Sequence, residues 1–198
     1  PDIGHVRYVT NSVELQLALI TARPGHTIEI AEGTYRGNFA ISTSGTADAP
    51  ITLRGQPGTI LDGGAYFLNY GLLVRGDYWH IENITLRNAK KGIVLHGASN
   101  NILSGVHLAD IGEEAIRLRN FSSGNTVENC SITRTGLLRP GFGEGIYIGT
   151  ADGDWAGETD GIPDRSDGTR VLNCKLGPDV SAELIDIKEG TTGGLIQG

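Results

Sequence analysis

The sequence has no long apolar run and no surplus of basic residues. Its 198 residues include 16 Lys and Arg against 23 Asp and Glu, which gives a net charge of −7. A net-acidic chain is poorly suited to non-specific binding of nucleic acid, so we expect no nucleic-acid partner. No stretch approaches the roughly 20 apolar residues that cross a bilayer, so we expect no membrane partner either. The pattern L-x-x-L-x-L-x-x-N is also absent, which excludes a leucine-rich repeat protein.

The chain does contain 30 glycines and a recurring β-prone segment. This segment alternates apolar and polar residues, the pattern of a strand with one buried face. Its copies begin at Ile51, Leu72, Ile93, Ile116, Ile146 and Ile185, with residues 27–30 before them. The early steps are 21 to 23 residues long, and the last two are 30 and 39. A period of this size indicates a solenoid, and the longer steps indicate loops inserted on one side.

A second series of β-prone segments runs in phase with the first and carries Asn or Gly at its third position. These positions are Asn83, Gly105, Asn129 and Asn173. Both residue types tolerate the left-handed backbone that bends one strand into the next, and stacked Asn side chains can hydrogen-bond along the stack. We therefore predict an all-β fold: a single-stranded right-handed parallel β-helix of about seven turns, with residues 1–198 forming one domain.

The two ends of this predicted solenoid differ. Residues 11–22 have the features of a capping helix, with Asn11 or Ser12 as the N-cap and Arg23-Pro24-Gly25 as its end. Its expected apolar face consists of Val13, Leu17 and Ile20, with Leu15 and Leu19 widening it. At the other end, the chain stops at Gly198 in the middle of the second series. We expect further polypeptide, or a second chain, to complete the helix there.

Cys130 and Cys174 occupy equivalent places in successive turns of the second series. Stacked strands are about 4.8 Å apart, so either a disulfide or two stacked core thiols would fit. Three sequons permit glycosylation of a secreted chain, and Asn120, expected in a loop, is the best candidate among Asn83, Asn120 and Asn129.

The outward residues of the first series form two columns. The first column consists of Arg54, Arg75, His96, Arg119, Gly149 and Lys188. The second column consists of Thr52, Leu73, Val94, Arg117, Tyr147 and Asp186. Stacked cations repel one another, and an extended polyanion lying along the column would offset that repulsion. The alternative is an ordinary solvated sheet face with its long side chains fanned apart.

Acidic residues recur just before successive strands of the first series, at Glu114, Glu144 and Glu183. With Asp186 and an acidic loop at residues 150–169, they can gather the carboxylate oxygens that Ca²⁺ prefers. Glu183, Glu144 and Asp186 are the predicted ligands, the loop aspartates are alternatives, and a solvated acidic rim is the other interpretation.

Two long loops, at residues 136–143 and 150–169, interrupt the otherwise regular repeat. Long loops on a regular scaffold usually carry function, and both should flank the surface that bears Lys188. Phe142 in the first loop and Trp155 in the second are candidates for stacking on a sugar ring.

The repeat and the motif Glu183-Leu184-Ile185-Asp186-Ile187-Lys188 resemble the parallel β-helix polysaccharide lyases. The similarity is greatest to the group of chondroitinase B and the alginate lyases, with the pectate lyases of similar fold more distant. The resemblance implies a secreted enzyme in which Glu183 binds calcium and Lys188 is the general base. It also implies an acidic, uronate-containing polysaccharide as substrate.

The sequence departs from that family at two places. The family has a second acidic residue where this chain has Ser181, and its catalytic arginine one turn after the lysine would fall beyond Gly198.

The chemistry of β-elimination suits the remaining residues. A cation and an arginine neutralise the uronate carboxylate, and a lysine takes the C5 proton if its pKa is depressed. Arg119 and partial burial would depress the pKa of Lys188, and Asp186 would oppose that effect. Tyr147 and His96 are candidate proton donors to the leaving oxygen, while Arg117 and Arg75 are candidate substrate-binding residues.

Two other functions are compatible with a β-helix. A glycoside hydrolase needs paired carboxylates at set separations, and the Asn-Thr-Asp, Asp-Asp, Gly-His-Gly and Arg-Ile-Lys signatures of polygalacturonases are all absent. A non-catalytic carbohydrate-binding or structural β-helix is the second alternative. Gly149, which interrupts the cation column, and the missing downstream arginine favour it.

Overall fold

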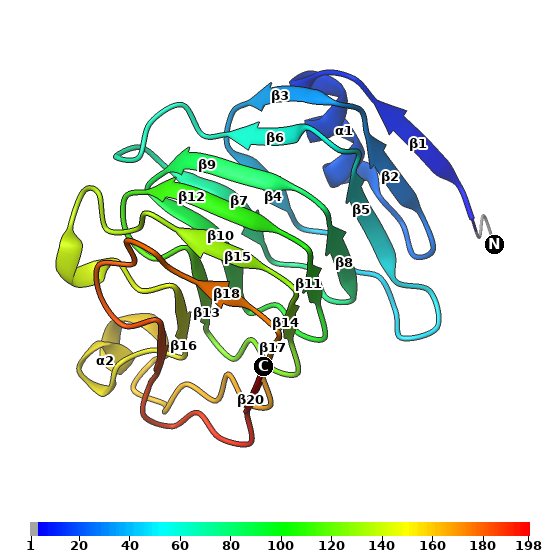
Figure 1. The fold of residues 1–198 in the computed structure, drawn as a ribbon. Helices are drawn as coiled ribbons and strands as arrows, with labels where there is room; N and C mark the ends of the chain where they lie inside the picture. Colours follow the sequence, from blue (N-terminus) through cyan, green and yellow to red (C-terminus); the bar gives the residue numbers. More distant parts are fainter. Residues whose placement is uncertain (1–3) are drawn as a thin grey trace.

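The computed structural model describes residues 4–198, which form a parallel β-helix of three sheets (Figure 1). Sheet 1 contains β1 (Val6–Val9), β2 (Thr27–Ile30), β5 (Ile51–Gly55), β8 (Trp79–Glu82), β11 (Ile102–Ser104), β14 (Thr126–Glu128), β17 (Arg170–Leu172) and β20 (Leu195–Gln197). Sheet 2 contains β3 (Gly33–Arg36), β6 (Thr59–Asp62), β9 (Thr85–Ala89), β12 (His107–Ile111), β15 (Ser131–Thr133) and β18 (Lys175–Leu176). Sheet 3 contains β4 (Phe39–Ile41), β7 (Tyr70–Val74), β10 (Lys91–His96), β13 (Ile116–Arg119), β16 (Ile146–Ile148) and β19 (Ile185–Ile187). This confirms the all-β parallel helix predicted from the repeat.

Identical inward positions of successive turns stack on one another to form the core. In sheet 3, Ile93 pairs with Ile116, and Ile116 pairs with Ile146. All three side chains are buried in one continuous apolar cluster. Each strand is too short to bury much surface alone, so its stability depends on the turns above and below it.

The bends between sheets 1 and 2 lie where the second series places them. Asn83, Gly105, Asn129 and Asn173 all have φ between 51° and 63°. These residue types accept the left-handed region at little cost, which confirms the role assigned to the third position. A buried amide ladder lies elsewhere: Asn125 Oδ1 accepts from the backbone N–H of Asn101 at 2.9 Å, and Asn101 Oδ1 accepts from that of Trp79 at 2.8 Å.

The first repeat series is correct from Leu72 onward but wrong for its two earliest members. Residues 27–30 and the segment starting at Ile51 lie in sheet 1, where Ile51 pairs with Trp79, not with Leu72. The residue that precedes Leu72 in sheet 3 is Phe39. Strands of all three sheets share the same alternation, so spacing alone did not separate one sheet from another.

Arg54 therefore does not belong to the predicted cation column. It lies on the outer face of sheet 1, where its guanidinium forms ion pairs with Glu29 at 2.9 Å and Glu82 at 2.8 Å. Thr52, which pairs with His80 in the same sheet, likewise leaves the neighbouring column.

The capping helix is confirmed as α1 (Ser12–Thr21), but its predicted face is wrong. Asn11 is the N-cap, and its side-chain oxygen accepts from the backbone N–H of Glu14 at 3.0 Å. Leu15 and Leu19 are fully buried, whereas Val13 is 78% exposed and Leu17 is 47% exposed. Two apolar stripes run side by side on this helix, and the helical period alone did not show which one faces the core.

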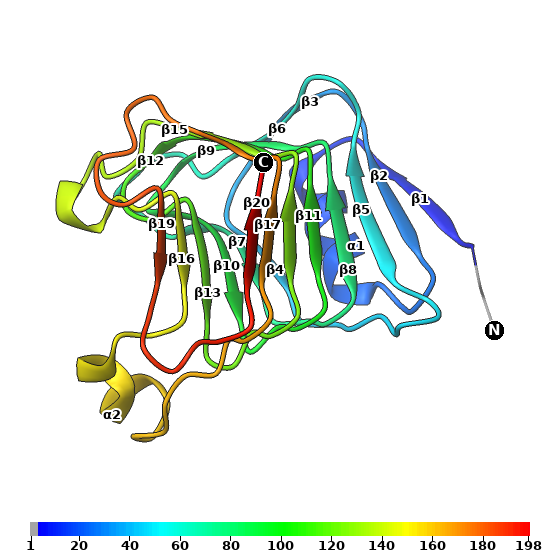
Figure 2. The ribbon, with the colours of Figure 1, turned by 60° about the horizontal axis from the view of Figure 1, so that its bottom comes forward.

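The two long loops flank β16 at its opposite ends (Figure 2). The 3₁₀ helix η1 (Pro140–Phe142) precedes the strand, and η2 (Asp152–Asp154) with α2 (Trp155–Glu158) follows it. Within residues 4–198, no helix is long and apolar enough to cross a bilayer.

Candidate active site

The outward columns of sheet 3 are confirmed by the strand register. His96 pairs with Arg119, and Gly149 and Lys188 follow directly after the paired residues Ile148 and Ile187. The neighbouring column is built by the pairs Leu73–Val94, Val94–Arg117, Arg117–Tyr147 and Tyr147–Asp186. Residues that are 20 to 40 positions apart in the sequence therefore share one face.

Glu144, Glu183 and Asp186 meet at one end of this face. One carboxylate oxygen from each lies within 4.8 Å of the others. Glu144 is buried, and its Oε2 has no hydrogen-bond partner among the described residues. Burial, and then the charges of Glu114, Asp186 and Glu183, raise the pKa of Glu144. Clustered carboxylates with an unpartnered buried oxygen fit a hard cation such as Ca²⁺.

Lys188 lies beside this acidic cluster and forms an ion pair with Asp186 at 2.7 Å. The hydrogen bond to Asp186 raises the pKa of Lys188, because it favours the charged ammonium. The prediction that Arg119 lowers the pKa of Lys188 is therefore wrong. Gly149 separates Arg119 from Lys188 in the column, so the carboxylate beside Lys188 has the larger effect.

Tyr147 lies between two cations on the same face. The Arg117 guanidinium carbon is 4.7 Å from the centre of the Tyr147 ring, and Lys188 Nζ is 5.1 Å from it. Arg117 is held in place by an ion pair with Glu114 at 2.7 Å. Burial raises the pKa of the Tyr147 hydroxyl, so this hydroxyl keeps its proton at neutral pH.

Arg119 and His96 form a second cluster, farther along the sheet. Arg119 Nε donates to His96 Nδ1 at 3.0 Å, and its guanidinium also contacts Glu158 of α2 at 3.2 Å. Burial, followed by the charges of Arg119 and Arg75, lowers the pKa of His96. The side-chain nitrogen of Asn120 is 3.2 Å from His96 Nε2, so the favoured sequon faces this cluster instead of open solvent.

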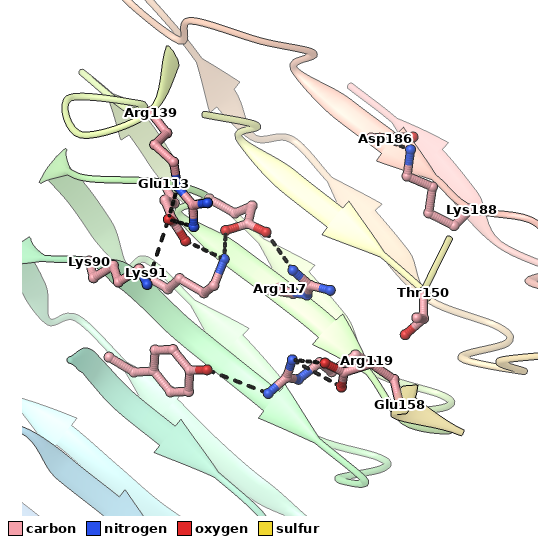
Figure 3. A network of polar contacts seen from close by, with 12 residues as sticks. Lys90, Lys91, Glu113, Arg117, Arg119, Arg139, Thr150, Glu158, Asp186 and Lys188 are labelled. Carbon is pink, nitrogen blue, oxygen red and sulfur yellow. Dashed lines mark hydrogen bonds and ion pairs between the residues drawn. The ribbon is translucent and has the colours of Figure 1, made fainter. Parts of the chain in front are cut away.

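A third group of charges, of which the sequence singled out only Glu114, lies at the amino-terminal ends of these strands (Figure 3). Glu113 is fully buried and forms ion pairs with Lys91 at 2.7 Å and with Arg139. Lys91 also contacts Glu114. The adjacent acidic pair Glu113-Glu114 was the available signal, but Lys91 belongs to the previous turn and only the register brings it close.

The predicted stacking residues lie on opposite sides of the face. Phe142 is half exposed, with the Arg139 guanidinium carbon 4.6 Å from its ring centre. Trp155 is half-buried, and its indole N–H donates to the carbonyl of Thr150 at 2.8 Å.

Arg75 is exposed and forms no ion pair with any described residue.

The acidic loop does not supply the predicted alternative ligands to the cluster. Its one fully buried carboxylate, Asp164, accepts from the backbone N–H groups of Asn120 and Phe121, both at 2.8 Å, and from the Thr150 hydroxyl at 2.7 Å. Asp164 thus holds the loop against the end of β13.

Cys130 and Cys174 are both free thiols, with Cys130 buried.

Known proteins support this description of the fold. Residues 7–135 match the family model "Pel9A-like, right handed beta helix region". A pectate lyase, PEL9 of Emericella nidulans, is 34% identical over 131 residues, which is 57% of this chain and 32% of that protein.

Two solved structures are similar over most of the chain. The alginate lyase from Paenibacillus sp. str. FPU-7 is 39% identical with a TM-score of 0.93, covering 97% of this chain and 64% of that one. The pectate lyase Pel9A is 20% identical with a TM-score of 0.71, covering 87% of this chain and 48% of that one, and shows the fold alone. The chain thus spans about a third of the curated relative and under two thirds of these structures. The resemblance to β-helix polysaccharide lyases is confirmed, and the chain belongs to the Pel9A-like right-handed β-helix family.

Proposed function

We propose that this chain carries the active face of a polysaccharide lyase that cleaves an acidic, uronate-containing polysaccharide by β-elimination. The observation that carries the proposal is the position of Lys188 beside Glu144, Glu183 and Asp186, with Arg117 on the same sheet face. The pectate lyase and alginate lyase names of the similar proteins support it.

Ca²⁺ is the cofactor that these residues fit. Glu144, Glu183 and Asp186 would hold it, because their three carboxylates lie close together and a buried oxygen of Glu144 has no partner among the described residues. Bound there, the cation would neutralise the uronate carboxylate and so make the C5 proton more acidic.

The chain's own residues would handle the proton transfers. Lys188 Nζ takes the C5 proton, the freed electron pair forms the C4–C5 double bond, and the C4–O bond breaks. Lys188 is free to act as a base only when Asp186 turns away from it, because their ion pair favours the protonated ammonium. Tyr147, which keeps its proton, would donate it to the leaving oxygen.

Arginines on the face would bind the polyanion. Arg117 lies against Tyr147, where a carboxylate of the substrate can reach it. Arg75 is exposed and without an ion pair among the described residues, so it is available to a further carboxylate. In this scheme His96 orients Arg119 by accepting its N–H, instead of donating a proton itself.

The test is the ultraviolet absorbance of an unsaturated uronide, measured with pectate and with alginate in the presence of Ca²⁺. We expect product with at least one polymer, and a loss of at least about 100-fold in Lys188→Ala. Lys175→Ala, on the exposed face of sheet 2, is the matched control and should keep full activity. Absence of product with every polyuronate, or an unchanged rate in Lys188→Ala, contradicts the proposal.

A non-catalytic carbohydrate-binding protein is the second candidate. The ion pair that keeps Lys188 protonated and the gap at Gly149 favour it. Binding of a polyuronate without turnover, with the same affinity in Lys188→Ala, selects this function.

The localisation of the protein can be inferred from the proposed substrate. Polyuronates lie outside cells, so we infer a secreted protein. Ile187, Leu195 and Ile196 in the last two strands are each about half exposed, so the last turns of the stack present an apolar surface.

A further inference from the structure

We propose that a pocket over β4 and β7, at the far end of sheet 3 from the acidic cluster, binds a distant sugar residue of the same polysaccharide chain. This inference rests on the proposed function and extends it to the length of substrate that the face recognises. The pocket has a volume of about 290 Å³ and is lined by Asn38, Phe39, Ala40, Asn69, Tyr70 and Leu73.

The strand register aligns the pocket with the candidate active site on one sheet face. Ala40 pairs with Leu73, and Leu73 begins the same outward column that reaches Tyr147 and Asp186. Leu73 and Asp186 are separated by four strand spacings, which is about 19 Å. One sugar of an extended chain advances by about one strand spacing, so a chain of about five sugars would reach from one to the other.

The lining of the pocket suits a sugar ring. Leu73 is half-buried and Ala40 is exposed, so they offer an apolar floor to one face of a pyranose. The Asn38 side chain donates to the carbonyl of Tyr70 at 2.9 Å, which leaves its own oxygen free for a hydroxyl. The exposed side chain of Asn69 makes no hydrogen bond with the described residues and can meet a second hydroxyl.

The charges around the pocket favour an acidic sugar. No carboxylate from residues 4–198 lines it. Arg75 follows Leu73 two residues later on the same outward face and has no ion pair among the described residues. The Tyr70 hydroxyl lies 3.5 Å from the Arg119 guanidinium, so Tyr70 links the pocket to the Arg119 and His96 cluster. We therefore assign the pocket to a uronate several residues from the bond that is cleaved.

The experiment blocks the pocket and compares substrates of different length. Ala40→Trp fills the space above Leu73, and Ala47→Trp, in an exposed loop, is the matched control. KM is measured with size-defined oligouronates of about three and about six sugars. We expect Ala40→Trp to raise KM for the longer substrate about tenfold and to leave the shorter one within about twofold. Ala47→Trp should change neither value.

A second variant tests the same pocket without adding bulk. Asn69→Asp places a carboxylate in the pocket, and Asn69→Ala only removes the amide. We expect Asn69→Asp to weaken binding of the longer oligouronate more than Asn69→Ala does, because the added charge repels the polyanion. Circular dichroism and the midpoint of thermal unfolding confirm that each variant is folded.

The outcomes separate this inference from the function on which it rests. The distant sugar site is overturned if a variant changes KM equally for the shorter and the longer oligouronate, or if no variant changes KM or binding of the longer oligouronate. Either result leaves the lyase proposal standing. Binding of a protein segment or of a second copy of this chain in the pocket would also overturn the sugar site without affecting the lyase proposal. If the unaltered protein neither binds nor cleaves either oligouronate, the proposed function fails, and the sugar site fails with it.

Discussion

The side chain of Glu144 is buried close to three other carboxylates, those of Glu114, Glu183 and Asp186. Its charge therefore costs stability as long as no cation is bound. We expect Glu144→Gln to stabilise the metal-free protein by about 1 kcal/mol. We also expect Ca²⁺ at a hundredfold excess over Kd to stabilise the unaltered protein by about 2.7 kcal/mol. Thermal unfolding in Ca²⁺ and in chelator measures both effects.

Glu32→Gln, an exposed acidic residue in a turn, is the control for that experiment and should respond to Ca²⁺ like the unaltered protein. If Glu144→Gln keeps the full response to Ca²⁺, Glu144 is not a ligand. If Ca²⁺ stabilises neither protein, the acidic cluster does not bind this cation.

The fully buried carboxylate of Glu113 ties the 136–143 loop to sheet 3 through Lys91 and Arg139. Burial alone would raise the pKa of Glu113, but the hydrogen bonds from these two cations hold it below its ordinary value of 4.5. Removing one member of a buried pair leaves the other unpaired, so we expect Glu113→Gln to cost about 3 kcal/mol. Chemical denaturation measures this cost. Arg165→Gln, which breaks an exposed ion pair, should cost under about 1 kcal/mol, and similar costs for the two variants would contradict the assignment.

His96 should make stability depend on pH. Its pKa in the folded protein lies below its ordinary value of 6.5, so at lower pH the unfolded chain binds a proton that the folded chain resists. Its contribution to stability is therefore present above about pH 6.5 and is lost as the pH falls through the lower folded value. We expect His96→Asn to lose less stability than the unaltered protein between about pH 7 and pH 5. In Arg119→Gln, nuclear magnetic resonance should show a higher pKa for His96. An unchanged value would show that the arginine charge has no part in the shift.

The sequence predicted single residues well where the strand pattern recurs in one sheet. Arg75, His96, Arg119 and Lys188 share a face as expected, because the same alternation of apolar and polar residues in each sheet 3 strand fixes which side chains point outward. Arg54 was misplaced because a sheet 1 strand has the same local pattern. Lys91 and Tyr70 were missed because their partners come from other turns, and no local signal marks such contacts.

The capping helix α1 provides a direct test of which apolar stripe supports the fold. Leu15 is fully buried and Leu17 is about half exposed, although they are two positions apart in the same helix. We expect Leu15→Ala to cost about 2 to 5 kcal/mol and Leu17→Ala to stay within about 0.5 kcal/mol. Thermal or chemical unfolding measures both. Equal costs would mean that the helix packs by both stripes.

Strands, bends and the helix cap could be predicted because each depends on nearby residues. Asn11 is an N-cap by its own side chain, and Asn129 bends the chain by its own tolerance of positive φ. The helix face could not be predicted, since it depends on the surface of the first turn, which lies elsewhere in the sequence.

The stack as a whole should be least stable at its last turns. β10 is almost entirely buried, whereas β20 is exposed throughout and β19 is half exposed. Each turn is stabilised by its neighbours, so an edge turn with little buried surface opens first. We expect amide hydrogen exchange in β19 and β20 to be at least about 100-fold faster than in β10 and β13. Equal protection along the stack would show that it unfolds as one unit.

The register of sheet 3 holds although the steps along the chain are unequal. The paired residues Ile116, Ile146 and Ile185 stay aligned across steps of 30 and 39 residues. The inserted loops at residues 136–143 and 150–169 can therefore change in length and sequence without moving Lys188 relative to Arg117. A chimera that exchanges residues 136–143 or 150–169 for those of another member of the family should keep its chemistry and acquire a different preference for sugars.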